Sequence, residues 1–284
     1  MTIIATNQLS EQQEQEVRQL IAEIRAYDNF TREPYLSNML NFDQDMPAFF
    51  LAYEKNELRG FLTVYADDPN EVDLFIWVAP AYRRQGIARQ LFERYQKETA
   101  IYGLGNPSFN IERHFLENNP WLLSAWQVIE SDESEFWMSR GRDKVDIEER
   151  RDIIVCQAEI QHLEAIAIFQ SETFEEDLEV CRQYAREAIE DESSLLYVVL
   201  RADEVIASCT VDLSSGDQLL YGLAVKNAEQ GKGIGTYMTK FILNDRIESD
   251  NRPFQIAVEA DNAVAKHLYE KLGFVTSSEI TYLK

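Results

Sequence analysis

The sequence predicts an α/β protein with mixed, mostly antiparallel sheets flanked by helices, built as two similar domains in tandem. Two glycine turns, Arg83–Ala88 and Gln230–Gly235, each follow an apolar stretch and open an amphipathic helical pattern. Gly86 and Gly233 lie 147 residues apart (233 − 86), and this single offset also aligns the strand-like segments before them without a gap. Strands, turn and helix that recur at one offset are typical of an internal duplication.

Each half has the same order of expected elements. A short strand, Thr2–Thr6 in the first half, leads into a helix that Ser10 and Gln13 begin as a capping box. Hairpin-like strands with turn residues between them come next, and the strand before each glycine turn is the third of this set. The expected strands are Ala48–Tyr53, Gly60–Tyr65 and Glu71–Val78 in the first half, and Asp152–Ala158, Ser194–Leu200, Val205–Leu213, Gln218–Val225 and Phe254–Glu259 in the second.

A length of 284 residues suits two domains of ordinary size. The stretch Ser139–Arg151 is charged and has few large apolar residues, which is typical of a linker. We therefore expect domains at residues 1–140 and 152–284, joined by residues 141–151.

Composition narrows the function classes. The formal charge is −23 and both halves are acidic, which excludes the basic face expected of a nucleic-acid-binding protein. No apolar run reaches the ~20 residues of a membrane span, and the first residues do not resemble a signal peptide. The three cysteines and three histidines are not spaced as metal ligands. We expect a cytoplasmic protein with no metal, no membrane partner and no nucleic-acid partner, and we leave the oligomeric state open.

The second glycine turn is suited to binding an anion. Glycines adopt positive φ without steric cost, and successive N–H groups at the start of a helix form an anion-binding concavity. The Gly-Lys-Ser/Thr of a P-loop is absent, and the spacing differs from that of a dinucleotide-binding turn. The turn is followed by a strand and then by the helical segment Asp261–Phe274, which Asn262 can cap and Gly273 can end.

Taken together, the C-terminal half resembles the GNAT superfamily of acyl-CoA-dependent N-acetyltransferases. The matching residues are Leu223-Ala224-Val225, then Gln230-x-x-Gly233-x-Gly235, then Asn262-x-x-Ala265-x-x-Leu268-Tyr269-x-x-x-Gly273-Phe274. The duplication extends a weaker resemblance to residues 1–138. The whole chain thus resembles a tandem protein of this superfamily.

The resemblance implies acetyl-CoA as cosubstrate and assigns roles by position. Backbone amides of the turn would bind the pyrophosphate of coenzyme A, the end of the preceding strand would pair with the pantetheine arm, and Asn262 would hydrogen-bond that arm. Tyr269 would donate a proton to the departing thiolate. The implied coenzyme-binding residues are Leu223, Ala224, Val225, Gln230, Gly231, Lys232, Gly233, Ile234, Gly235, Thr236 and Asn262.

Structural interpretations of the same residues stand beside these roles. Asn262 could serve only as a helix cap, and Tyr269 only as a core residue on an apolar face. In the implied reaction an amine attacks the thioester directly, and a backbone N–H near Val225 holds the oxyanion. The general base stays open. Glu259 and Asp212 are candidates, although a solvated strand end explains both carboxylates better than catalysis does. A base acting through water and loss of the amine proton to solvent are the alternatives.

The first half retains the turn but not the later motif. Coenzyme binding there would use Val78, Arg83, Arg84, Gln85, Gly86, Ile87 and Ala88. At the offset of 147, however, Asn262 aligns with Phe115 and Tyr269 with Leu122, so we expect a degenerate domain without turnover. Three roles stay open for it: binding coenzyme without turnover, shaping the acceptor cleft, or serving as an evolved remnant core. Its aromatic residues are expected to fill space, with a ligand-lining role as the less favoured alternative. They are Phe109, Phe115, Trp121, Trp126, Phe136 and Trp137.

The leading hypothesis is an N-acetyltransferase that acts on a small-molecule primary amine in its C-terminal domain. A non-catalytic acyl-CoA-binding protein and an acetyltransferase of protein N-termini or lysines are the alternatives.

Overall fold

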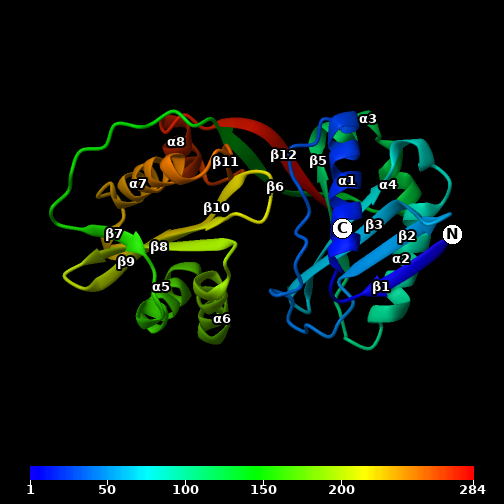
Figure 1. Ribbon diagram of the computed structural model, residues 1–284, viewed down its shortest axis with the longest axis horizontal. Helices are drawn as coiled ribbons and strands as arrows, with labels where there is room; N and C mark the ends of the chain where they lie inside the picture. The colour runs from blue at the N-terminus through cyan, green and yellow to red at the C-terminus, as the bar shows by residue number, and fades with distance from the viewer. The chain divides into compact units, whose positions relative to one another are not determined.

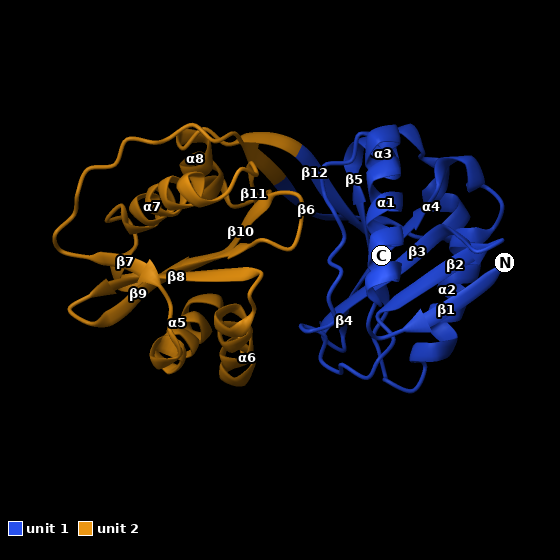
Figure 2. Cartoon of the chain, viewed as in Figure 1, with its two compact units in different colours: residues 1–136, 278–284 blue, residues 137–277 orange.

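The computed structural model describes all residues from Met1 to Lys284. The chain forms two compact units, one of residues 1–136 together with 278–284 and the other of residues 137–277 (Figure 2). The expected domains, 1–140 and 152–284, differ from these units because residues 278–284 pack with the first unit.

The first unit is a mixed sheet with helices on both faces (Figure 1). Its strand order is β1-β2-β3-β4-β5-β12, and every neighbouring pair is antiparallel except β4 and β5. The strands are β1 (Thr2–Thr6), β2 (Phe49–Glu54), β3 (Glu57–Asp68), β4 (Glu71–Val78), β5 (Pro107–Glu112), most of β6 (Glu130–Arg140) and the later part of β12 (Val275–Leu283). The helices are α1 (Glu11–Asp28), α2 (Ile87–Thr99), α3 (Arg113–Asn118) and α4 (Trp121–Trp126).

Helices α1 and α2 cover opposite faces of this sheet. Val17, Leu20, Ile21 and Ile24 of α1 form a cluster with Phe61 and Trp77, so the helical spacing seen in the sequence is the buried face. Ile87, Leu91 and Tyr95 of α2 pack with Leu62, Leu74 and Val78 on the other face. The Ser10–Gln13 capping box is confirmed, with Ser10 Oγ accepting from Gln13 N and Gln13 Oε1 accepting from Ser10 N.

The second unit repeats this plan. Its strand order is β7-β8-β9-β10-β11-β6, with β10 and β11 as the parallel pair. Helices α5 and α6 lie on one side of the sheet and α7 and α8 on the other (Figure 1). The elements are β7 (Ile154–Gln157), α5 (Leu163–Phe174), α6 (Leu178–Glu190), β8 (Ser194–Arg201), β9 (Glu204–Asp212), β10 (Gln218–Val225), α7 (Ile234–Ser249), β11 (Phe254–Glu259) and α8 (Ala263–Lys271).

The duplication is visible in the bounds of equivalent elements. Strands β4 and β10 start and end 147 residues apart, and so do β5 and β11. A short 3-10 helix directly precedes each glycine turn at matching positions, Pro80–Tyr82 and Asn227–Glu229.

The segment expected to be a linker packs against α7 instead of lying free. Asn244 exchanges hydrogen bonds with the backbone of Val145, and Arg142 donates to the carbonyl of Ile247. Arg150 reaches the second glycine turn, where it donates to the carbonyl of Lys232 at 3.1 Å. The segment 141–151 is therefore an ordered part of the second unit.

Candidate functional site

Both glycine turns have the backbone geometry that binds anions. Gly86 (φ 83°) and Gly233 (φ 74°) are the N-caps of α2 and α7, and neither helix is capped by a side chain. Arg84 (φ 62°) and Gly231 (φ 74°) hold the matching left-handed position before them. The first helical hydrogen bonds start at Gln90 N and Tyr237 N, so the amides before them remain available to an external acceptor.

One side chain anchors each turn to the strand before it. Gln230 Nε2 donates to the carbonyl of Val225 at 3.1 Å, and Arg83 Nε donates to the carbonyl of Val78 at 3.0 Å. The two residues therefore have the same structural role at equivalent positions. Arg83 also forms an ion pair with Asp28 of α1, which has no counterpart in the second turn.

The parallel strands below each turn pair only at their beginnings. Strands β4 and β5 pair from Val72/Pro107 to Leu74/Phe109, and β10 and β11 pair from Gln218/Phe254 to Leu220/Ile256. Beyond these residues the strands of each pair separate, while each continues for at least three residues more. The unpaired edges in the gap offer backbone groups to an extended ligand.

A β-bulge distinguishes β10 from β4. The register of β10 against β9 slips between Tyr221 and Ala224, where Gly222 has φ +60°. Pairing of β4 with β3 runs without a slip from Tyr65/Asp73 to Gly60/Val78. The bulge removes backbone groups near Leu223 from the β9 ladder and leaves them beside the gap. The sequence signal for it is a glycine inside a strand, which the strand prediction for Gln218–Val225 overlooked.

The predicted residues of the second unit gather at this gap. Leu223, Ala224 and Val225 form the last part of β10, Gln230 to Gly233 form the turn, and Ile234, Gly235 and Thr236 begin α7. Helix α8 lies against them, because a Cβ on Gly235 would stand 3.7 Å from Leu268 Cδ1 and 3.5 Å from Val225 Cγ2. Asn262 caps α8 by accepting from Ala265 N at 3.0 Å, which leaves its amide nitrogen for other partners.

Tyr269 of α8 is buried but has no hydrogen-bonding partner in the protein. Its side chain is 5% exposed, packs edge-on against Phe274 and faces Cys209 of β9. Burial, and secondarily the nearby thiol of Cys209, raises the pKa of the hydroxyl well above its usual value. The hydroxyl therefore stays protonated at any physiological pH.

The two candidate bases, Asp212 and Glu259, differ in the hydrogen bonds that they accept. Both carboxylate oxygens of Asp212 accept hydrogen bonds from Ser214, its backbone N–H at 2.7 Å and its hydroxyl at 3.0 Å, so this residue shapes the turn after β9. Glu259 is exposed at the end of β11.

The charged side chains around the second glycine turn form ion pairs with one another. Arg201 pairs with Glu229 and Asp152, Lys232 pairs with Glu229, and Arg150 pairs with Asp152. Hydrogen bonds from Arg201 and Lys232 lower the pKa of Glu229, and those from Arg150 and Arg201 lower the pKa of Asp152. These carboxylates are therefore ionised and neutralised in place, so they oppose an incoming anion less than free ones would.

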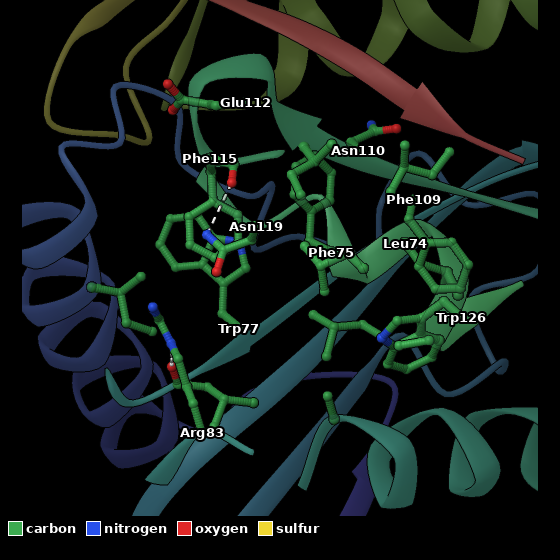
Figure 3. A pocket seen from close by; sticks show the side chains of 18 of the residues that line it. Leu74, Phe75, Trp77, Arg83, Phe109, Asn110, Glu112, Phe115, Asn119 and Trp126 are labelled. Atoms are coloured by element: carbon green, nitrogen blue, oxygen red, sulfur yellow. Dashed lines mark hydrogen bonds between the residues drawn. The ribbon is translucent and has the colours of Figure 1, made fainter. Parts of the chain in front are cut away.

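The first unit contains a cavity of about 430 Å³ at the gap between β4 and β5. This volume lies within the usual range for small-molecule sites. Four of the aromatic residues expected to fill space, Phe109, Phe115, Trp121 and Trp126, instead line it, whereas Phe136 and Trp137 do not. Figure 3 shows Phe109, Phe115 and Trp126 around the cavity together with Phe75 and Trp77. The residues Val78, Arg83, Arg84, Gly86, Ile87 and Ala88 of the first turn also lie on its wall, whereas Gln85 does not.

The two units share one fold, in which two parallel strands part beside the N-terminus of a helix that no side chain caps. The chain belongs to the GNAT acetyltransferase superfamily and is a tandem member of it. Two models of that family match, one described as acetyltransferase (GNAT) family at residues 14–104 and one as acetyltransferase (GNAT) domain at residues 156–283.

Solved structures show the same tandem fold. The chain is similar to a GCN5-related N-acetyltransferase from Sphaerobacter thermophilus (16% identity, TM-score 0.73, 99% of this chain and 94% of that one). A tandem GNAT protein from the clavulanic acid biosynthesis pathway, solved without acetyl-CoA, has 13% identity and a TM-score of 0.73, with 99% and 98% of the two chains covered. A GNAT-family acetyltransferase from Colwellia psychrerythraea has 16% identity and a TM-score of 0.63, with coverage of 100% and 99%. No curated protein sequence matches the chain. No helix has the length and apolar character of a membrane span.

Proposed function

We propose that the chain transfers an acetyl group from acetyl-CoA to a primary amine on a small molecule, and that the second unit performs the chemistry. The observation that carries this proposal is Tyr269, a buried residue in a helix packed against the glycine turn and the bulged strand. Its hydroxyl accepts and donates no hydrogen bond within the protein and is not among the fully buried unpaired atoms, so it retains accessible surface on which a ligand can bind.

The residues of the second unit fit the coenzyme. The uncapped amides at the start of α7 would bind the pyrophosphate, and the free edge of β10 from Leu223 to Val225 would hydrogen-bond the pantetheine arm. Asn262 would donate its amide N–H groups to the same arm. When bound, the coenzyme supplies an acetyl group activated as a thioester.

The neutral amine would attack the thioester carbonyl, and backbone N–H groups freed by the bulge would stabilise the oxyanion that forms. The new ammonium would lose its proton to solvent water as the C–S bond breaks. Tyr269 would donate its proton, or a hydrogen bond, to the departing sulfur. Its raised pKa keeps the donor form populated, although it also makes the hydroxyl a weaker acid. Leu122 replaces it in the first unit, so we propose that the first unit binds coenzyme A without turnover.

The test is release of free thiol from acetyl-CoA in the presence of a panel of small primary amines, a peptide with a free N-terminus and a peptide with a lysine. We expect turnover with at least one small amine. Turnover with the peptides alone would favour a protein acetyltransferase. Tight coenzyme binding without thiol release from any acceptor would favour the non-catalytic binding protein.

A further inference from the structure

The cavity of the first unit passes through the sheet. On the α2 side its walls include Leu74, Val78 and Ile87, which belong to the core cluster under that helix. On the α1 side its walls include Phe30 and Trp77, which belong to the cluster under α1. A ligand that enters beside the first glycine turn can therefore extend between β4 and β5 to the opposite face.

The far end of this cavity is aromatic. Phe30 lies 5.2 Å from Trp77 and 5.1 Å from Phe115, measured between ring centroids, and Phe75 lies on the same face. Two of these rings already face a guanidinium, with Arg32 over Phe75 at 4.7 Å and Arg83 over Phe115 at 5.5 Å, measured to the ring centroids. A cationic amine at this end would therefore meet like charges, whereas an apolar chain would be stabilised by its burial.

The ionisable residues on the wall at this end are already engaged. Glu112 is 5% exposed, and its Oε1 accepts from the backbone N–H groups of Thr31 at 2.6 Å and Arg32 at 3.0 Å. Its Oε2 accepts from the hydroxyl of Ser278 and lies 3.5 Å from His114 Nδ1. Arg32 pairs with Glu135 at 3.2 Å. Figure 3 shows the Glu112 carboxylate directed away from Trp77 and Phe115, so it is not placed as a base.

The near end of the cavity is cationic. Arg84 and Arg89 lie at the start of α2 and form no ion pair with a carboxylate, although the chain has 50 acidic residues against 27 basic ones. Arg84 stacks over Trp121 at 4.0 Å from the ring centroid, and Arg89 donates to the carbonyl of Ala125 at 3.0 Å. Two unpaired guanidiniums beside an uncapped helix N-terminus complement a phosphate group.

We propose that the first unit binds a coenzyme A thioester with an apolar acyl chain longer than acetyl, and holds it without transfer. The phosphates lie at Arg84 and Arg89, and the acyl chain occupies the aromatic end. Leu122 stands in place of the tyrosine proton donor, so the thioester stays intact. This inference rests on the proposed coenzyme role of the first glycine turn.

Chain-length dependence of binding tests the proposal. On the full-length protein, titration calorimetry gives affinities for coenzyme A, acetyl-CoA and hexanoyl-CoA, and tryptophan fluorescence reports the first unit because Trp77, Trp121 and Trp126 line the cavity. Each buried methylene tightens binding by about fourfold at most. We expect hexanoyl-CoA to bind at least about tenfold more tightly than acetyl-CoA and to change the fluorescence. Equal affinities for the two thioesters would overturn the proposal.

Matched variants locate the site. Arg84→Glu with Arg89→Glu, both exposed, should weaken the hexanoyl-CoA site by about tenfold or more, whereas Lys232→Glu in the second unit should leave it unchanged. The opposite result would place the site in the second unit and contradict the inference.

A cavity-filling variant distinguishes the contribution of the acyl chain to the affinity from the contribution of the coenzyme A moiety. Phe75→Trp, or Phe115→Trp if the first does not fold, should retain affinity for coenzyme A and lose the preference for the hexanoyl thioester. A retained preference would show that the chain lies elsewhere. These experiments measure binding and fluorescence. If no amine releases thiol from acetyl-CoA, the proposed transfer reaction is contradicted, but the proposal that the first unit binds a longer acyl-CoA is not affected.

Discussion

Arg83 and Gln230 occupy the same place in the two glycine turns and donate to the same carbonyl of the preceding strand, at Val78 and Val225. The guanidinium of Arg83 goes further and pairs with Asp28, whose side chain is 7% exposed. One turn is thus tied to α1 by charge, whereas the other is anchored by a neutral amide.

This difference gives a stability prediction. Arg83→Gln should retain the bond to Val78 but leave the buried Asp28 carboxylate unpaired, which lowers the free energy of unfolding by about 1–3 kcal/mol. Adding Asp28→Asn should recover most of the loss, because the uncompensated charge is gone. Urea denaturation of both variants checks this, and an equally unstable double variant would contradict it.

Tyr269→Phe separates catalysis from stability. The hydroxyl has no protein partner, so its removal should leave the unfolding temperature unchanged while kcat falls on the order of 100-fold and coenzyme affinity stays near wild type. Unchanged kcat would remove Tyr269 from the mechanism.

The pH dependence of kcat follows from the raised pKa of Tyr269. A hydroxyl with a raised pKa is protonated below that pKa and loses its proton only as the pH rises through it, above the ordinary value of about 10. Tyr269 should therefore cause no fall of kcat between about pH 6 and about pH 9. A decline in that range that disappears in Tyr269→Phe would contradict the assignment.

At the scale of the element, the β-bulge is a difference between the two units, because β10 has it and the equivalent strand β4 does not. Gly222 has a φ of +60°, a left-handed backbone conformation that costs a valine roughly 1–2 kcal/mol of conformational energy. We expect Gly222→Val to lower kcat by about tenfold or more, because the backbone donors of the gap shift. Gly103→Val is the control, since Gly103 has φ +68° and a Cβ at this position would have no neighbour within 4 Å. Equal effects of both variants on kcat would rule out a specific role of the bulge.

At the scale of the whole molecule, the sequence predicted what local patterns determine. The bounds of β4, β10 and β11 follow from apolar alternation ended by turn residues, and the capping box of α1 follows from Ser10 and Gln13. The sequence did not predict that residues 278–284 belong to the first unit. Strand β12 pairs with β5 at a separation of about 170 residues, and no local sequence pattern determines that pairing. The cavity was missed for a related reason: aromatic residues such as Phe109 and Trp126 are indistinguishable from core residues until the parting of β4 and β5 is known.

The pairing of β12 gives a further prediction. Ile280 and Leu283 are 1% and 4% exposed and line the cavity of the first unit. Each substitution to alanine should lower the free energy of unfolding by about 2–5 kcal/mol and weaken ligand binding in the first unit. Val275→Ala, on the same strand but 66% exposed, should have little effect. Denaturation followed by tryptophan fluorescence checks this, and equal losses for all three variants would contradict it.

The same pairing fixes the order in which the protein matures on the ribosome. Residues 1–136 cannot complete their sheet until residues 278–284 have been made, and 141 residues (277 − 136) are synthesised in between. At about 5–20 residues per second, the first unit waits roughly 7 to 28 seconds with the edge of β5 unpaired. The second unit, made later, has nearly all of its own residues at hand as it emerges. The unit that is translated first is therefore the one whose sheet is completed last, and in that interval the free edge of β5 is open to pairing with other chains.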